Sequence, residues 1–255
     1  MPFLVAISVG NTRTAVGHFH DERAAGVRRF GNADLEGIVE CVREAWAHRG
    51  EEDGEIVVAS VNDATAIAVE AAVASALHAD VWRLGRDLEV PIGRCLDEGA
   101  TPGQDRLLAA AAAFAMVKQS VIVVDAGTAV TVDFVDGEGV FHGGAIMPGA
   151  QMQLDAMHAR TAALPEVRFA APEAGEAFGR NTVAAMRLGV FEGIRGGVRA
   201  LVERYATSYG AFPLVIATGG DAEVLFDDQE IAQRVVPDLV LQGIRVAVQA
   251  AAQAE

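Results

Sequence analysis

The chain has 255 residues and a formal net charge of −15, and 51% of its residues are hydrophobic. This length suits two domains, and the hydrophobic content is sufficient for packed cores and excludes a disordered protein. The strong negative charge argues against a nucleic-acid groove and against docking on an anionic membrane, because both need clustered Lys and Arg.

Cysteine usage and hydropathy favour a cytoplasmic protein. The only two cysteines, Cys41 and Cys95, are too few for a disulfide framework, which favours a reducing compartment. Cys41 falls in an apolar helical pattern and is expected in the core. No signal peptide is recognisable, and no apolar run reaches the ~18–20 residues of a membrane span.

The first half of the chain alternates predicted strands and helices. Strands are predicted over 3–9, 12–19, 55–61 and 80–84, and helices over 35–48 and 64–78. Gly10-Asn11-Thr12 separates the first two strands and predicts a β-hairpin. His18 and His20 share one face of the second strand, where we expect surface residues. The segment 85–103 is rich in Pro, Gly and charge and predicts a loop.

The second half begins with a predicted helix over 105–117 and then repeats the opening pattern. Strands over 120–125 and 129–134 enclose Ala126-Gly127-Thr128, and Asp133 is expected to be solvated. A Gly-rich stretch at 143–149 precedes helices over 150–159, 182–205 and 239–252, with a strand over 214–217. The repeat predicts duplicated α/β domains, 1–104 and 105–255, although two Gly-Thr turns can also arise by chance.

Three small-residue turns follow apolar strands and are candidates for phosphate binding: Gly10-Asn11-Thr12, Gly127-Thr128 and Thr218-Gly219-Gly220. Gly, Asn and Thr offer backbone N–H groups and hydroxyls without bulk, and ligands gather at the carboxyl ends of strands. A single such turn is usually structural, whereas three favour a nucleotide cleft between two domains. The chain has no P-loop and Lys118 is its only lysine, so backbone donors, hydroxyls, Arg and metal would hold the phosphates.

Two aspartates are placed for chemistry. Asp105 opens a predicted helix, where it is either a helix cap or a general base for a substrate hydroxyl, with Arg106 available to clamp an anion. Asp125 ends a strand next to a candidate phosphate turn, which makes it a candidate ligand for a metal or monovalent cation. The histidines lack zinc spacing and no G-x-S-x-G elbow occurs, which disfavours a zinc site and an α/β-hydrolase.

Six blocks in this order resemble the type III pantothenate kinases of the acetate and sugar kinase/Hsp70/actin superfamily. The blocks are Gly10-Asn11-Thr12, Gly103-Gln104-Asp105-Arg106, Asp125-Ala126-Gly127-Thr128-Ala129, Gly143-Gly144-Ala145-Ile146 with Pro148-Gly149, Gly179-Arg180-Asn181-Thr182 and Ala217-Thr218-Gly219-Gly220. The resemblance implies an α/β fold of duplicated ribonuclease-H-like (actin-like ATPase) domains with a nucleotide cleft between them. It also implies the transfer of phosphate from ATP to pantothenate, the first step towards coenzyme A.

The resemblance further implies residue roles, cofactors and a homodimer. Asp105 would be the general base, and Asp125 would bind a monovalent cation, K⁺ or NH₄⁺, in addition to Mg²⁺ held with ATP. The implied substrate contacts are Gly103, Gln104, Asp105, Arg106, Thr182 and Leu96. The implied ATP contacts are Ser8, Val9, Gly10, Asn11, Thr12, Arg13, Thr14, Ala15, Thr128 and Gly219.

The chain departs from the family pattern at two positions. Ser8 stands where the first motif has Asp, so a carboxylate expected to help place Mg²⁺ is missing. Leu96 stands where an aromatic residue often precedes the Gly-x-Asp-Arg motif. A second hypothesis is therefore a weakened or inactive relative that binds nucleotide or regulates a partner. A third is a kinase for another small hydroxylated metabolite.

Overall fold

The computed structural model describes residues 3–22, 24–173, 175 and 177–254, which belong to two compact units. Unit 1 runs to Met116 and resumes at Asp238, and unit 2 is Val117–Pro237. Unit 1 thus contains the last helix, α7 (Leu239–Ala254), and nearly all of α3 (Gln104–Val117). The division of the duplicated domains between residues 104 and 105 stays a prediction.

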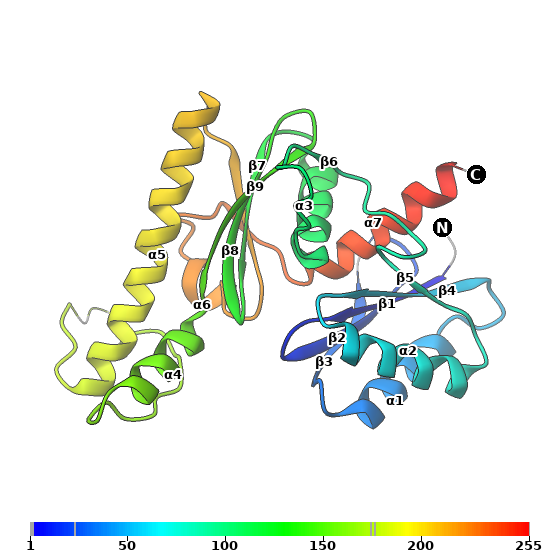
Figure 1. Ribbon diagram of the computed structural model, residues 1–255, viewed down its shortest axis with the longest axis horizontal. Helices are drawn as coiled ribbons and strands as arrows, with labels where there is room; N and C mark the ends of the chain where they lie inside the picture. The colour runs from blue at the N-terminus through cyan, green and yellow to red at the C-terminus, as the bar shows by residue number, and fades with distance from the viewer. Residues whose placement is uncertain (1–2, 23, 174, 176, 255) are drawn as a thin grey trace. The chain divides into compact units, whose positions relative to one another are not determined.

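Unit 1 is a five-stranded sheet in the order β3-β2-β1-β4-β5, with helices on both faces (Figure 1). Its central strand β1 is antiparallel to β2 and parallel to β4. Side chains of β1 alternate between a core shared with α1 and α2 and the face that α7 covers. The strands are β1 (Phe3–Val9), β2 (Arg13–Phe19), β3 (Ala25–Gly31), β4 (Gly54–Ser60) and β5 (Val81–Arg83). The helices are α1 (Leu35–Ala47) and α2 (Asp63–Leu77), and the short β6 (Gly93–Arg94) precedes α3.

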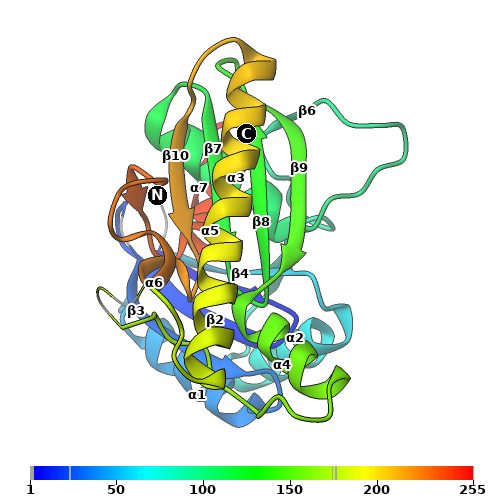
Figure 2. The ribbon, with the colours of Figure 1, turned by 90° about the vertical axis from the view of Figure 1, so that its left-hand side faces the viewer.

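Unit 2 has a sheet in which its own strands follow the order β11-β10-β7-β8-β9. The long helix α5 lies across one face of this sheet (Figure 2), and it packs against α4, α6 and β8. The strands are β7 (Val121–Ala126), β8 (Ala129–Val135), β9 (Val140–Pro148), β10 (Leu214–Thr218) and β11 (Arg234–Val235). The helices are α4 (Ala150–Arg160), α5 (Thr182–Tyr209) and α6 (Ala222–Phe226).

The two sheets have the same topology, which confirms the predicted duplication. In each unit a central strand pairs antiparallel with the next strand of the chain, and that strand pairs antiparallel with the third. On its other side the central strand pairs parallel with the fourth strand, which pairs parallel with the fifth. Strand β1 therefore corresponds to β7, and the tip after β1 corresponds to the tip after β7.

Two expectations about polar residues are wrong. His18 is only 8% exposed, because its ring stacks on Phe3 and on His48, which follows α1. Asp133 is 1% exposed; it lies on β8, an inner strand of the sheet, and its Oδ1 would lie 2.6 Å from a Cβ on Gly144 of β9. The neighbour that buries His18, His48, comes from a distant part of the sequence. Cys41 is buried as expected, and Cys95 is exposed; both are free thiols.

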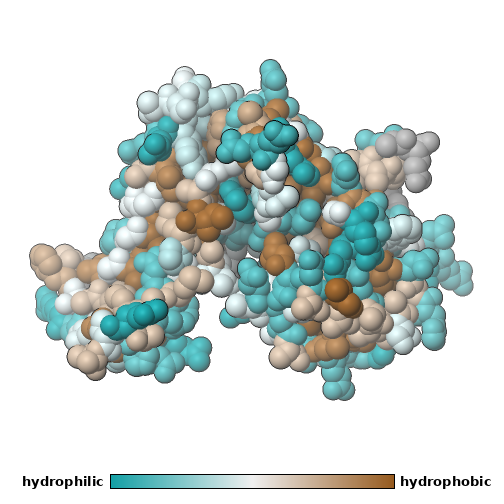
Figure 3. Space-filling view, viewed as in Figure 1, coloured by the Kyte–Doolittle hydropathy of each residue, from teal (hydrophilic) through white to brown (hydrophobic). Residues whose placement is uncertain are grey.

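Polar and apolar residues are interspersed over the face drawn in Figure 3, as expected for a chain with a net charge of −15. Within the described residues, no helix combines the length and the apolar character that crossing a membrane would require.

Candidate active site

The first predicted phosphate turn lies at the carboxyl end of β1, at the centre of the unit 1 sheet. The Gly10 N–H donates to the Arg13 carbonyl across the turn at 2.9 Å, which closes the hairpin. Asn11 and Thr12 are exposed at its tip. The other candidate ATP contacts flank the tip on the two paired strands: Ser8, Val9, Arg13, Thr14 and Ala15.

Asn32, which directly follows β3, holds this tip in place. Its Nδ2 group donates to the carbonyls of Gly10 at 2.9 Å and Asn11 at 3.1 Å. Its Oδ1 accepts from the Thr14 hydroxyl at 3.0 Å, and its backbone N–H donates to the Thr12 carbonyl at 3.3 Å. Because these bonds occupy the carbonyls of the tip, Asn32 fixes the tip backbone. Asn32 was missed by sequence reasoning, since nothing local to it marks a partner more than twenty positions earlier in the chain.

The Gly103–Arg106 segment reaches the same edge of the unit 1 sheet. The Val61 N–H donates to the Val9 carbonyl at 3.1 Å, so the residue after β4 adjoins the residue before the tip. A Cβ on Gly103 would lie 3.4 Å from Val61 Cγ1 and 2.5 Å from Asp105 Oδ1. The Asp105 carboxylate therefore lies over Gly103, beside the carboxyl ends of β1 and β4. Its Oδ1 accepts from the Arg106 N–H at 2.8 Å.

The second predicted phosphate turn is built similarly in unit 2. The Gly127 N–H donates to the Ala129 carbonyl at 3.0 Å, and the Gly149 N–H donates to the Thr128 carbonyl at 3.1 Å. Gly149 thus binds the tip as the backbone of Asn32 does in unit 1. A Cβ on Gly149 would lie 2.1 Å from the Gly127 carbonyl oxygen, so only glycine fits this approach. The Pro148-Gly149 block therefore supports the tip that carries Thr128.

Asp125 and Gly219 are brought together by the parallel pairing of β7 and β10, in which Asp125 is opposite Thr218. Gly219 has φ +97°, and a Cβ there would lie 2.5 Å from Asp125 Oδ1 and 2.3 Å from the Ala126 carbonyl oxygen. A left-handed backbone against a carboxylate and a carbonyl admits glycine alone. The two predicted contacts of unit 2, cation and ATP, are thus neighbours.

Thr182 and Leu96 lie on other elements. Thr182 is the exposed first residue of α5, and the preceding Asn181 caps that helix by accepting from the Ala184 N–H at 2.9 Å. The Gly179–Thr182 block therefore forms the start of α5. Leu96 is half-buried and lies in the segment of chain that joins β6 to α3.

No cluster of three or more His, Cys, Asp or Glu side chains among the described residues could enclose a metal ion. Mg²⁺ is commonly held by one or two carboxylates together with substrate phosphates, and a site of that kind needs no such cluster. Asp125, near the carboxyl end of β7 and beside Gly219, is a carboxylate at the second tip that could hold a cation.

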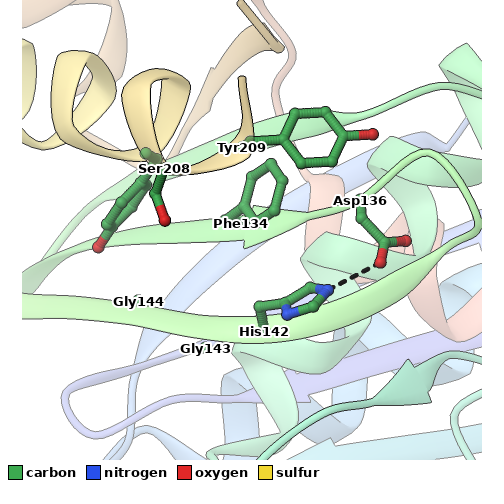
Figure 4. A pocket seen from close by; sticks show the side chains of 8 residues that line it. Phe134, Asp136, His142, Gly143, Gly144, Ser208 and Tyr209 are labelled. Atoms are coloured by element: carbon green, nitrogen blue, oxygen red, sulfur yellow. Dashed lines mark hydrogen bonds and ion pairs between the residues drawn. The ribbon is translucent and has the colours of Figure 1, made fainter. Parts of the chain in front are cut away.

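A pocket of about 470 Å³ lies elsewhere in unit 2, between the hairpin of β8 and β9 and the end of α5 (Figure 4). Aromatic rings and the Asp136–His142 pair line it. Partial burial opposes ionisation of Asp136, but hydrogen bonds from His142 and from backbone N–H groups hold the pKa of this carboxyl below its usual value. None of the predicted catalytic, ATP or cation contacts lines this pocket.

Comparison with known proteins identifies the family. The sequence profile of the type III pantothenate kinases matches residues 4–204. The chain belongs to the type III pantothenate kinase family. Curated type III pantothenate kinases from Syntrophotalea carbinolica and Rhodospirillum rubrum are 32% identical over 250 residues and 33% identical over 252 residues. These alignments cover 95% of this chain and 97% and 96% of the two relatives.

Solved structures show the fold of this type III pantothenate kinase family member. A Baf family protein from Campylobacter jejuni has a TM-score of 0.61 at 18% identity, over 98% of this chain and 99% of that one. MreB5 of Spiroplasma citri bound to ADP has a TM-score of 0.55 at 10% identity, over 100% of this chain and 98% of that one. The predicted actin-like ATPase fold is confirmed. By its family the protein is an ATP-dependent kinase, which uses ATP and a divalent metal.

Proposed function

We propose that this protein phosphorylates pantothenate with ATP, giving ADP and 4′-phosphopantothenate in the first step of coenzyme A biosynthesis. The family match supports the reaction, and one observation supports the chemistry. The Asp105 carboxylate lies beside Val61, which is hydrogen-bonded to Val9 at the base of the first tip. A candidate base and a candidate phosphate turn thus share one edge of one sheet.

In this mechanism Asp105 accepts the proton of the pantothenate hydroxyl. The hydroxyl oxygen bonds to the γ-phosphorus as the bond to the β–γ bridging oxygen breaks, and ADP leaves with that electron pair. Arg106 stabilises negative charge on the transferring group or on the pantothenate carboxylate. Gly103, Gln104, Thr182 and Leu96 are proposed to contact pantothenate.

The ATP phosphates are proposed to bind the hairpin tips that Asn32 and Gly149 hold, with Thr128 and Gly219 as contacts in unit 2. When bound, Mg²⁺ would neutralise charge on the phosphates. Asp125 is proposed to hold a monovalent cation, K⁺ or NH₄⁺, because a carboxylate next to a phosphate turn needs a positive partner. A homodimer in the cytoplasm is proposed from the family resemblance and the free thiols.

The test is pantothenate-dependent ADP release by the purified protein with ATP, Mg²⁺ and K⁺. Asp105→Asn is expected to lower kcat by roughly 10²–10⁴, the usual contribution of a general base. Asp34→Asn is the matched control, because Asp34 caps α1 through the Gly37 N–H and asparagine caps helices equally well. Full turnover by Asp105→Asn would remove this residue from the mechanism.

Ser8 supports one alternative, a relative that binds nucleotide without turnover. It occupies the motif position of the missing Asp, two residues before Gly10, on the face of β1 opposite to Ile7 and Val9. Nucleotide binding without ADP release in the native protein, with release restored by Ser8→Asp, would favour this alternative. Turnover with a different alcohol, and not with pantothenate, would instead indicate another substrate.

A further inference from the structure

The turn after β5 contacts the Gly103–Arg106 segment through a residue that has no side chain. Gly85 has φ +85°, and a Cβ at this position would lie 2.7 Å from Gln104 Nε2 and 3.4 Å from Gln104 Cδ. The first distance is shorter than real Cβ contacts. The Gln104 side chain therefore occupies the space that any other residue at position 85 would fill.

This turn is braced on several sides, so it has little freedom to move away. The Leu84 N–H donates to the Val58 carbonyl of β4 at 2.9 Å, and the Gly85 N–H donates to the Leu88 carbonyl at 2.7 Å. The Arg83 N–H donates to Asp87 Oδ2 at 2.8 Å.

Charged side chains add a second set of braces. Arg83 pairs with Glu70 of α2, and both side chains are largely buried. Arg86 joins the same Glu70 at 3.2 Å and Asp87 at 2.7 Å. Because the turn is bound to both β4 and α2, an added side chain at position 85 would displace Gln104 rather than the turn.

The Gln104 side chain packs against this turn. Its Oε1 atom is buried and accepts no hydrogen bond from the described residues. A buried polar atom without a partner is uncommon and calls for a physical reason. Gln104 is also the first residue of α3 and directly precedes Asp105. The side chain whose place the turn sets is therefore adjacent in sequence to the proposed base.

We propose that Gly85 is a positioning residue for pantothenate binding, because its missing side chain provides the space in which Gln104 is oriented. The inference rests on the proposed function, in which Gln104 contacts pantothenate. The Gly85→Ala variant is expected to raise the KM for pantothenate about tenfold, which corresponds to about 1.4 kcal/mol, while the KM for ATP stays within twofold.

Gly50→Ala is the matched control. Gly50 also has a positive φ, +61°, but a Cβ there would meet nothing within 4 Å, and the residue lies in the turn after α1. Both alanines carry backbone strain, so both are expected to lower the urea midpoint of unfolding. Only Gly85→Ala is expected to change the pantothenate KM. An equal change in both variants would attribute the effect to strain and overturn the proposal.

A double-mutant cycle isolates the contact with Gln104. Gln104→Ala removes the atoms that a Cβ at position 85 would strike, so Gly85→Ala is expected to change the pantothenate KM less than twofold in that background. Fully additive effects, or an unchanged KM in Gly85→Ala, would overturn the positioning role.

The same four proteins separate this inference from the proposed function. Their urea midpoints give the coupling between positions 85 and 104 without any substrate. If the native protein does not turn over pantothenate, the proposed function fails, and a non-zero coupling still supports the orientation of Gln104 by Gly85. If turnover is normal and both the midpoints and the KM values are additive, the proposed function stands and this inference fails.

Discussion

Replacing Asn32 by alanine removes the side chain that holds the first phosphate turn. Three hydrogen bonds are lost: those donated to the carbonyls of Gly10 and Asn11, and the one accepted from Thr14. At about 0.5–1.5 kcal/mol each, their loss lowers the free energy of unfolding by roughly 1.5–4.5 kcal/mol. The Thr14 side chain is fully buried in the native protein, so its hydroxyl loses its hydrogen-bond partner on Asn32.

The functional consequence should fall on ATP. A mobile tip has to be ordered when phosphate binds, so the KM for ATP is expected to rise by tenfold or more, while the KM for pantothenate changes little. The measurements are urea unfolding and steady-state ADP release at varied ATP. Asp34→Ala is the control, since it removes the α1 cap, at about 1 kcal/mol, without touching the tip.

Asn32→Asp keeps a polar side chain at position 32 but removes the hydrogen bonds that Asn32 donates to the tip carbonyls. The carboxylate can still accept from Thr14, but it cannot donate to the tip carbonyls, and its negative charge adjoins the proposed phosphate site. We therefore expect weaker ATP binding than in Asn32→Ala. The reasoning is refuted if Asn32→Ala loses stability and keeps its native KM for ATP, because the tip would then bind phosphate without this support.

Three further variants test other parts of the structure. Ser8→Asp adds the carboxylate that the motif lacks and is expected to lower the Mg²⁺ concentration for half-maximal turnover roughly tenfold, about 1.4 kcal/mol; an unchanged Mg²⁺ titration would contradict this role. Gly219→Ala forces a side chain into a left-handed backbone packed against a carbonyl, which should lower the free energy of unfolding by about 1–3 kcal/mol and weaken ATP binding. Gly220→Ala is its control, because a Cβ there meets open space and the variant should be near native in both measurements. Burial lowers the pKa of His18, and His48 adds to the effect. As pH drops below about 6.5, the unfolded chain therefore binds a proton at His18 before the folded protein does, and the free energy of unfolding falls. His18→Phe should flatten the change in urea midpoint between about pH 7.5 and pH 5.5 that this titration predicts, and an equal change in both proteins would exclude His18 as its source.

The sequence is sufficient to predict the features that are local. An apolar strand followed by Gly and Thr predicts each hairpin tip, and the repeat of that pattern predicts the duplication that the two matching strand orders confirm. The position of Asp105 at a helix start was also predictable, because Pro102-Gly103 just before it predicts a turn that precedes the helix.

The features that were missed either lack a periodic sequence pattern or depend on residues far apart in the chain. Strand β3 is an edge strand with exposed Arg28 and Arg29, so it lacks the alternation that predicts a half-buried strand, and Asn32 follows it. Strand β9 contains two glycines, and β11 and α6 are too short for a periodic pattern. The burial of His18 depends on a ring supplied by the end of α1.

The position of α7 bears on how the polypeptide matures. This helix packs against β1, β2 and β4, yet it is encoded after the whole of unit 2. During synthesis the first sheet therefore leaves the ribosome with one face uncovered, whereas unit 2 is continuous and can fold as soon as it emerges. Until α7 has emerged, the nascent protein would expose an apolar surface of the kind that chaperones bind.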